Sequence, residues 1–309
     1  MFKKLTAACL ISALLAAALT LVVQKMYNHS MSLESHGEDA KDDAKVIQRA
    51  INQSYKNKGG LVKLTGNKRY VIRSGLIIRE GVTLELGQNT KILIDGDFRA
   101  IQLEKNASII NGILEVVDPS FNSEVIHLDG KHQFWSWERT TVHNVSIINS
   151  SGSHKGTAIS LYAKGKENFI SFVNFTDNKA AGFYTGIKVK VDHDEKKEGQ
   201  SWINGNRFVN MTMDDCVNFI DIDSSVSIPN ESSGNQFIGL QIQLSKLSKT
   251  IMKVSGSYNT FQGMVWDQHL LNDEDKIVQF TQESANNKMD MNVDVFSVEN
   301  KGVQNSYTK

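Results

Sequence analysis

The feature that most constrains this chain is a degenerate repeat in its second half. The segments GNRFVNMTMDD, GNQFIGLQIQ and YNTFQGMVWD share the pattern Asn-x-Phe-x-(Asn or Gly). Phe208, Phe237 and Phe261 are therefore in register, with spacings of 29 and 24 residues. Earlier segments, such as NASIINGILEV and ENFISFVNFTDN, are looser versions of the same pattern.

A spacing of this size, holding two or three short strands, is typical of one rung of a parallel β-solenoid. Rungs stack about 4.8 Å apart, so equivalent side chains form ladders inside the core. Asparagine suits the corners, because it tolerates left-handed backbone conformations. The alternative is a strand-rich β-sandwich in which the repeat is a coincidence.

The rest of the chain reads as short strands rich in Val, Ile, Leu and Thr, bounded by Gly, Asn, Asp or Ser. An antiparallel meander would need a tight-turn dipeptide between most neighbours. Such dipeptides are few and occur at Asn111-Gly112, Asp95-Gly96, Asp129-Gly130 and Asn204-Gly205. The pattern therefore favours an all-β fold with parallel pairing.

One amphipathic helix is predicted at residues 43–57, with Asp42 or Asp43 at its start and Gly59-Gly60 after its end. It would cover the open end of the solenoid, where unpaired strand edges are a liability. Helical spacing places five apolar side chains on one face: Val46, Ile47, Ala50, Ile51 and Tyr55.

The N-terminus predicts export. Lys3 and Lys4 precede 19 uncharged residues, about the length that crosses a bilayer, with the lysines on the cytoplasmic side. Residues 1–23 are either a signal anchor or a cleaved signal peptide, since Ala16 and Ala18 form a small-x-small pattern. Residues 24–41 then form a tether, and residues 42–309 form one domain outside the cytoplasm.

Charge and cysteine content add exclusions. Lys plus Arg and Asp plus Glu both number 34, so no net field attracts nucleic acid. Cys216 is the single cysteine of the exported part, which excludes an intrachain disulfide there.

The stretch from Asp42 to about Asp95 resembles the start of the pectate-lyase-like superfamily. The shared features are an Asp-led capping helix, Gly-Gly, a Val-x-Leu strand, a Tyr-containing turn and then VTLEL. The resemblance implies a right-handed parallel β-helix. It also implies a family of polysaccharide lyases, glycoside hydrolases, uronate epimerases and tailspikes, with non-catalytic members, so the fold alone does not assign chemistry.

The segment MDDC is similar to the Asp-Asp-Cys element of polygalacturonases, which matches Asp214 and Asp215 to that family's aspartate pair. Glycoside hydrolysis needs two carboxyl groups held on a rigid surface. Asp194 lies 21 residues before Asp215, about one rung, and is expected beside it. The Gly-His-Gly and Arg-x-Lys of the later rungs of that family are absent here.

The segment VDHDE is similar to the Asp-Pro-His-Asp element of mannuronan epimerase-type β-helices, without its proline. The resemblance implies that His193 moves a sugar proton, supported by Asp192 and Asp194. Lys188 and Lys190 alternate on the preceding strand and would neutralise a uronate. The alternative is a solvated charged turn.

Aromatic side chains add candidate sugar-binding positions. Trp135 and Trp137 lie two residues apart beside Arg139, in a segment that interrupts the repeat as an inserted loop would. Trp202 extends this surface or fills a corner. The alternative for the loop is a hydrophobic flap packed on the domain.

Calcium would enter only with lyase chemistry, which needs several carboxylate oxygens around one ion. Asp221 and Asp223 are the candidates, and their alternation with Ile220 and Ile222 is equally typical of an outward strand face.

The sequence thus predicts a polysaccharide-binding β-helix. Whether it is a lyase, hydrolase or epimerase of an acidic glycan, or a non-catalytic surface or assembly protein that uses the β-helix as a rigid rod, stays open at this stage.

Overall fold

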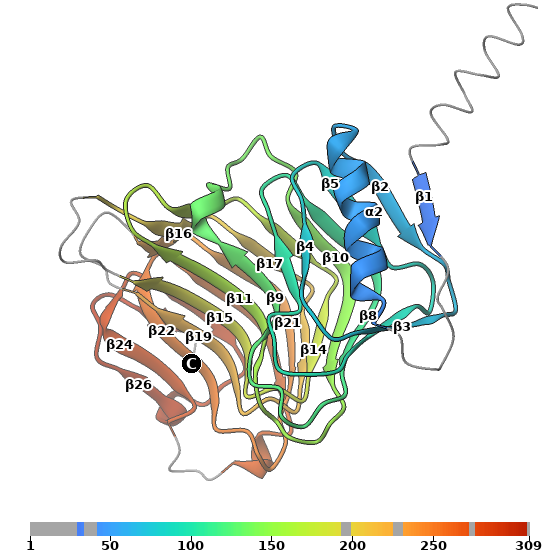
Figure 1. Cartoon of the computed structure of the whole chain (residues 1–309). Helices are drawn as coiled ribbons and strands as arrows, with labels where there is room; N and C mark the ends of the chain where they lie inside the picture. The colour runs from blue at the N-terminus through green and yellow to red at the C-terminus, as the bar shows by residue number, and fades with distance from the viewer. Residues whose placement is uncertain (1–29, 34–41, 193–198, 225–230, 272–275, 308–309) are drawn as a thin grey trace, which may run out of the picture.

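The chain folds as a parallel β-solenoid. The computed structural model describes residues 30–33, 42–192, 199–224, 231–271 and 276–307. Every strand pair among them is parallel, and each strand pairs with its equivalent one rung away, so that colour advances from blue to red along the stack (Figure 1). The expected parallel β-helix, rather than a sandwich, is confirmed.

The strands of the described residues form two long sheets, which we call sheet A and sheet B. Sheet A holds β1 (Ser30–Leu33), β2 (Gly60–Leu64), β3 (Arg69–Ile72), β5 (Val82–Glu85), β6 (Lys91–Ile94), β8 (Ser108–Val116), β10 (Thr141–Asn149), β13 (Asn174–Thr176), β14 (Lys179–Ala181), β17 (Arg207–Val209), β18 (Thr212–Asp214), β21 (Gln236–Gln243), β23 (Thr260–Trp266), β25 (Lys288–Met291) and β27 (Ser306–Tyr307).

Sheet B holds β4 (Leu76–Ile78), β7 (Ile101–Leu103), β9 (Glu124–Asp129), β11 (Thr157–Lys164), β12 (Phe169–Ser171), β15 (Thr185–Asp192), β16 (Trp202–Asn204), β19 (Asn218–Asp223), β20 (Ser232–Ser233), β22 (Thr250–Ser257), β24 (Val278–Ala285) and β26 (Val298–Asn300). The helical elements are α2 (Ala44–Lys56) and three short 3₁₀ turns, η1 (Gly130–His132), η2 (Gln268–Leu270) and η3 (Val295–Ser297).

Rungs differ in length, because the corners between the sheets absorb extra residues. Gly60 pairs with Val82, 22 positions later, whereas Ser108 pairs with Thr141, 33 positions later. The expected range of about 24 to 30 residues is therefore too narrow, and this variation decides below which predicted site residues meet.

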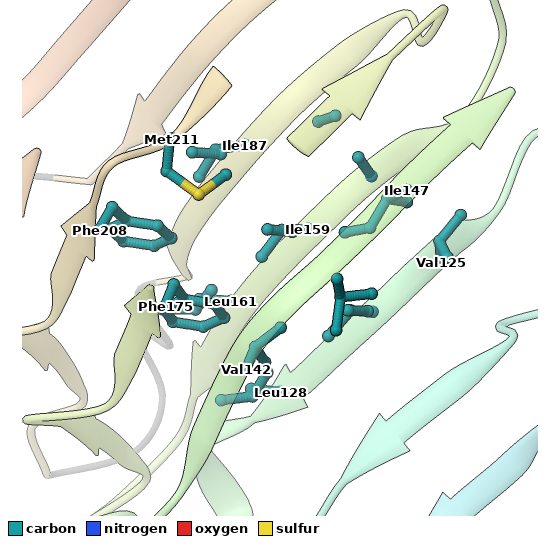
Figure 2. Close-up of a cluster of buried hydrophobic side chains, with 14 of the residues drawn as sticks. Val125, Leu128, Val142, Ile147, Ile159, Leu161, Phe175, Ile187, Phe208 and Met211 are labelled. Atoms are coloured by element: carbon teal, nitrogen blue, oxygen red, sulfur yellow. The ribbon is translucent and has the colours of Figure 1, made fainter. Parts of the chain in front are cut away.

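The predicted phenylalanine ladder forms the middle of the core. Phe208 pairs in register with Phe237, and Phe237 with Phe261. Phe175 extends the ladder by one rung, and successive ring centroids lie 4.4, 4.6 and 4.9 Å apart in stacked geometry. All four rings are fully buried, and Figure 2 shows the first two side by side among aliphatic side chains. Rung spacing alone imposes this stacking distance.

A second ladder is made of buried asparagines at the first position of the repeat. Asn235 Oδ1 accepts hydrogen bonds from the backbone N–H and the Nδ2 of Asn206, at 3.1 and 2.9 Å. Asn235 donates in the same way to Asn259, and Asn259 donates to Asn287. These amides satisfy backbone groups that the corners leave unpaired.

The second asparagine of the repeat has a different role. Asn210 has φ 55°, in the left-handed region, and its equivalent one rung on is Gly239 with φ 71°. Earlier corners place Asn111 and Asn144 at φ 56° and 52°. The alternation of Asn and Gly in the repeat thus follows from backbone conformation, as predicted.

Helix α2 covers the first rungs, as predicted (Figure 1). Asp42 Oδ1 accepts the N–H of Ala44 at the helix start, and Asp43 Oδ2 accepts the N–H of Val71, which ties the helix to β3. The predicted apolar face is partly wrong, because Tyr55 is exposed and its ring lies under the Arg79 guanidinium at 4.5 Å. Ala44 and Ser54 are buried with Ile47, Ala50 and Ile51 instead.

No helix among the described residues is long and apolar enough to cross a membrane. The predicted anchor or signal peptide at residues 1–23 lies outside the described residues, as does most of the tether.

Candidate functional site

A groove of about 320 Å³ runs across the outer face of sheet B over four successive rungs, which contribute β11, β15, β19 and β22. We call it the sheet B groove. Its long direction follows the stack of rungs, because its lining residues are register partners from one strand to the next. The lining residues are Asn122, Gly156, Thr157, Tyr184, Thr185, Lys188, Asn218, Ile220, Asp221, Thr250 and Lys253.

One wall of the groove is a row of hydroxyl and amide side chains. Thr157, Thr185, Asn218 and Thr250 stand at the start of the four strands and pair in register. Hydroxyls and amides both donate and accept hydrogen bonds, so this row can meet a ligand rich in hydroxyl groups.

The other wall is a row of charges, three residues further along each strand. Lys188, Asp221 and Lys253 are register partners on β15, β19 and β22. Lys188 Nζ lies 4.0 Å from Asp221 Oδ2. Lys253 is exposed and, within the described part of the chain, makes no ion pair within 4.0 Å. The groove therefore offers cationic groups on both sides of one carboxylate.

Asp221 is partly removed from water by its position between the two lysines. Burial raises the pKa of Asp221 above its ordinary value, although the charges of Lys188 and Lys253 work in the opposite direction. Its carboxyl group is thus a stronger proton acceptor than a solvated aspartate.

The corner that leads into β19 carries the predicted aspartate pair. Asp215 Oδ2 lies 2.7 Å from His154 Nε2, and Asp215 has φ 50°. Asp214 is exposed at the end of β18, where partial desolvation and then the charge of Asp215 raise its pKa. A raised carboxyl pKa beside a His–Asp pair is the kind of arrangement that supports proton transfer.

Asp192 belongs to a different cluster, at the far end of sheet B. Tyr162 Oη donates to Asp192 Oδ2 at 2.8 Å, and Lys190 Nζ lies 3.1 Å from Asp192 Oδ1. Partial burial works to raise the pKa of Asp192, but these two hydrogen bonds outweigh it and the pKa lies below its ordinary value. Partial burial and the bond to Asp192 raise the pKa of Tyr162 to about 12.

The structure does not bring Asp192 together with Asp214 and Asp215. Asp214 pairs with Ala181 in sheet A, 33 positions earlier, whereas Asp192 pairs with Lys164 in sheet B. Thr185, the register partner of Asn218, lies about 23 Å from Asp192 along a strand that rises about 3.3 Å per residue. The one-rung relation inferred from a spacing of 21 residues is therefore wrong. His193 and Asp194 lie outside the described residues.

The predicted aromatic residues form a cluster beyond the end of sheet B. Trp135 packs edge-to-face on Trp137 at 5.9 Å and on Phe169 at 5.6 Å, and Phe169 stacks on Trp202 at 4.7 Å. Trp137 is 79% exposed, and Arg139 is also exposed. Trp135 and Trp202 are half-buried, so the cluster combines a packed base with one free ring.

No group of three or more His, Cys, Asp or Glu side chains suited to one metal ion occurs among the described residues. Asp221 and Asp223 do lie on an outward strand face, as the alternation indicated, and both lie near lysines. The thiol of Cys216 is buried, which raises its pKa to about 12.

Sequence reasoning missed several residues of these sites: Tyr184, His154, Lys253 and Tyr162. Their strands were recognised, but only strand register places them beside one another. The period-2 alternation of IKVKV and IMKV did mark Lys188 and Lys253 as outward-facing.

No family model matches this sequence, and no curated protein matches it. Among solved structures, it is similar to the A-module of the Azotobacter vinelandii mannuronan C-5 epimerase AlgE6, with 14% identity over 89% of this chain and 97% of that one, and a TM-score of 0.34. The AlgE4 A-module gives 14% identity, 89% and 96% coverage, and a TM-score of 0.31.

A tailspike protein of E. coli bacteriophage HK620, in complex with a pentasaccharide, gives 13% identity over 88% of this chain and a TM-score of 0.40. The chain spans 61% of that tailspike's length. The assignment of the fold rests on the strand pairing described above.

Proposed function

We propose that this chain is a polysaccharide-binding protein that holds an acidic glycan in the sheet B groove. The observation that carries the proposal is the pair of rows that line the groove. The hydroxyl and amide row suits sugar hydroxyls, and Lys188 and Lys253 suit uronate carboxylates. Both rows stand on hydrogen-bonded strands of a solenoid, so the site is formed before the ligand arrives.

The glycan would lie parallel to the stack of rungs, because both rows run in that direction. Tyr184, 53% exposed at the corner before β15, lines the groove and offers a ring on which a sugar face can stack. Four rungs span about 14 Å at about 4.8 Å per spacing, enough for several sugars.

The test is calorimetry of the full-length chain with octasaccharides of acidic and of neutral sugars. We expect binding of acidic octasaccharides that weakens about tenfold in Lys253→Ala, since a charged hydrogen bond contributes about 1.5 to 3 kcal/mol. Lys179→Ala is the matched control, because Lys179 is an exposed strand lysine on sheet A. Equal binding of neutral sugars, or equal losses in both variants, would refute the proposal.

Catalysis is a second candidate, supported by the His154–Asp215 contact of 2.7 Å beside Asp214. Asp214 would protonate a leaving oxygen, and the His–Asp pair would accept a proton. The test is an assay for reducing ends and for unsaturated uronates, with Asp214→Asn and Asp215→Asn. Turnover lost in both variants establishes an enzyme, and unsaturated product distinguishes a lyase from a hydrolase. Calcium belongs to the lyase arm alone.

The epimerase-type assignment of Asp192 and His193 is tested separately, with Asp192→Asn and a uronan whose C5 configuration is followed by NMR. Asp192 has Tyr162 and Lys190 as neighbours, which suits a site that positions a uronate. Trp135, Trp137, Arg139 and Trp202 remain proposed sugar contacts, with Trp137 the ring free to stack. An absence of binding and turnover would favour the rigid rod.

We further propose that the solenoid is right-handed and stands outside the cytoplasm. Handedness is supported by the strong bias of parallel strand connections. Location is supported by the uncharged stretch of the first 23 residues, as an anchor or as a signal peptide. Fractionation of cells, with sizing of the mature N-terminus, separates these two.

A further inference from the structure

The charges on the outer face of sheet B alternate from rung to rung. Strand β15 carries Lys188 and Lys190, β19 carries Asp221 and Asp223, and β22 carries Lys253. Within the sheet B groove, the order along the stack is therefore positive, negative, positive.

The two cations that face the groove are two rungs apart, which is about 10 Å at the usual strand spacing. An extended glycan advances by about one strand spacing per sugar, so neighbouring sugars would lie over neighbouring rungs. A sugar over Asp221 would then lie between two sugars that each face a lysine.

Resting on the proposed function, we propose that the groove selects a linear glycan in which one sugar in two carries a carboxylate. Acidic sugars lie over Lys188 and Lys253, and the neutral sugar between them donates its hydroxyls to Asp221. A glycan with a carboxylate on every sugar places one of them against the Asp221 carboxylate. Juxtaposed like charges oppose binding, and such a clash is a common source of specificity.

The hydroxyl row supports the same reading, because it is uninterrupted. Thr185, Asn218 and Thr250 are uncharged partners on the same three strands, so they accept sugars of either kind. Discrimination therefore rests on the charged row, and within it on the single carboxylate that lines the groove among the described residues.

The experiment compares affinities of the full-length chain by calorimetry at fixed salt. The probes are a hyaluronan octasaccharide, in which acidic and neutral sugars alternate, a galacturonate octasaccharide, and a galacturonate tetrasaccharide that equals the first in number of carboxylates. We expect the alternating probe to bind at least about tenfold more tightly than either homopolymer.

Asp221→Asn is the decisive variant, since it removes the negative charge and keeps the shape. We expect it to strengthen galacturonate binding about tenfold and to change hyaluronan binding much less. Asp223→Asn is the matched control: Asp223 lies on the same strand, two residues on, and does not line the groove. It should leave the ratio of affinities unchanged.

The outcomes separate the two proposals. If the homopolymer binds the unaltered chain as tightly as the alternating probe, and Lys253→Ala weakens both, the groove binds acidic glycans without this selectivity and the inference is wrong. If Asp221→Asn leaves the ratio unchanged, the inference also fails. If none of the acidic probes binds, the proposed function fails with it.

Discussion

His154 Nε2 lies 2.7 Å from Asp215 Oδ2, although 61 positions separate the two residues. The contact joins the corner before β11 to the corner before β19, and thus passes over the rung of β15 between them. A link across two rungs holds the corner loops together at the edge of the sheet B groove, whose lining includes Gly156 and Tyr184 from the same corners. It also places a negative charge beside Asp214.

The titration of Asp214 should report that charge. Partial desolvation and then the Asp215 carboxylate raise the pKa of Asp214. We expect Asp215→Asn to lower the pKa of Asp214 while leaving it above its ordinary value, because desolvation remains. Carboxyl ¹³C chemical shifts followed against pH measure this directly, and an unchanged midpoint would mean that the two carboxyl groups are not electrically coupled.

Tyr162 should be the tyrosine that ionises last. Its pKa is raised to about 12 by partial burial and by the hydrogen bond to Asp192. Because the folded state holds this proton more tightly than the unfolded state, its contribution to stability is lost as pH rises from about 10 to about 12. Absorbance titration of phenolate should show a step near pH 12 among the seven tyrosines, absent in Tyr162→Phe. Asp192→Asn should move that step to lower pH.

His127 makes the solenoid sensitive to acid. Its side chain is buried on the outer face of sheet B, where Nδ1 lies 3.3 Å from Ser160 Oγ and Nε2 has no hydrogen-bond partner among the described residues. Burial, and then the charge of Arg99, lower the pKa of His127 to about 4. The imidazole is therefore neutral in the folded chain at neutral pH.

The sign of the pH effect follows from this depressed pKa. The unfolded state binds the proton first, so stability is lost as pH falls from about 6.5 to about 4, by on the order of 3 kcal/mol. Urea unfolding at several pH values measures the loss, and His127→Gln should reduce the slope in this window. A ring that titrates near pH 6.5 by NMR would show that His127 is solvated and would contradict the prediction.

The phenylalanine ladder could be predicted because its members occupy one position of a repeat. Phe208, Phe237 and Phe261 keep the same local pattern, and a core position tolerates no other register. The proposed meeting of Asp194 with Asp215 had no such support. It assumed a constant rung, whereas the step from Ala181 to Asp214 is 33 residues.

The sheet B groove was beyond sequence reasoning for the same reason. Lys188, Asp221 and Lys253 could each be placed on an outward strand face, yet their order along the stack depends on corner lengths that the pattern does not encode. Tyr184 stands in such a corner. Outer rows carry little of the core's constraint on residue type, so they leave no repeat to detect.

The two asparagines of the repeat should differ sharply when each is replaced. Asn235 is fully buried, and its side chain bonds Asn206, Asn259 and the carbonyl of Ile203. Asn235→Ala leaves several of these buried groups without partners, each costing about 1 to 3 kcal/mol, so we expect a loss of at least about 3 kcal/mol in the free energy of unfolding. Asn210→Gly should change it by under about 1 kcal/mol, because glycine adopts the left-handed φ of 55° without strain. Urea unfolding of both variants decides the matter: similar losses would mean that the buried amide ladder contributes no more to stability than the corner conformation does.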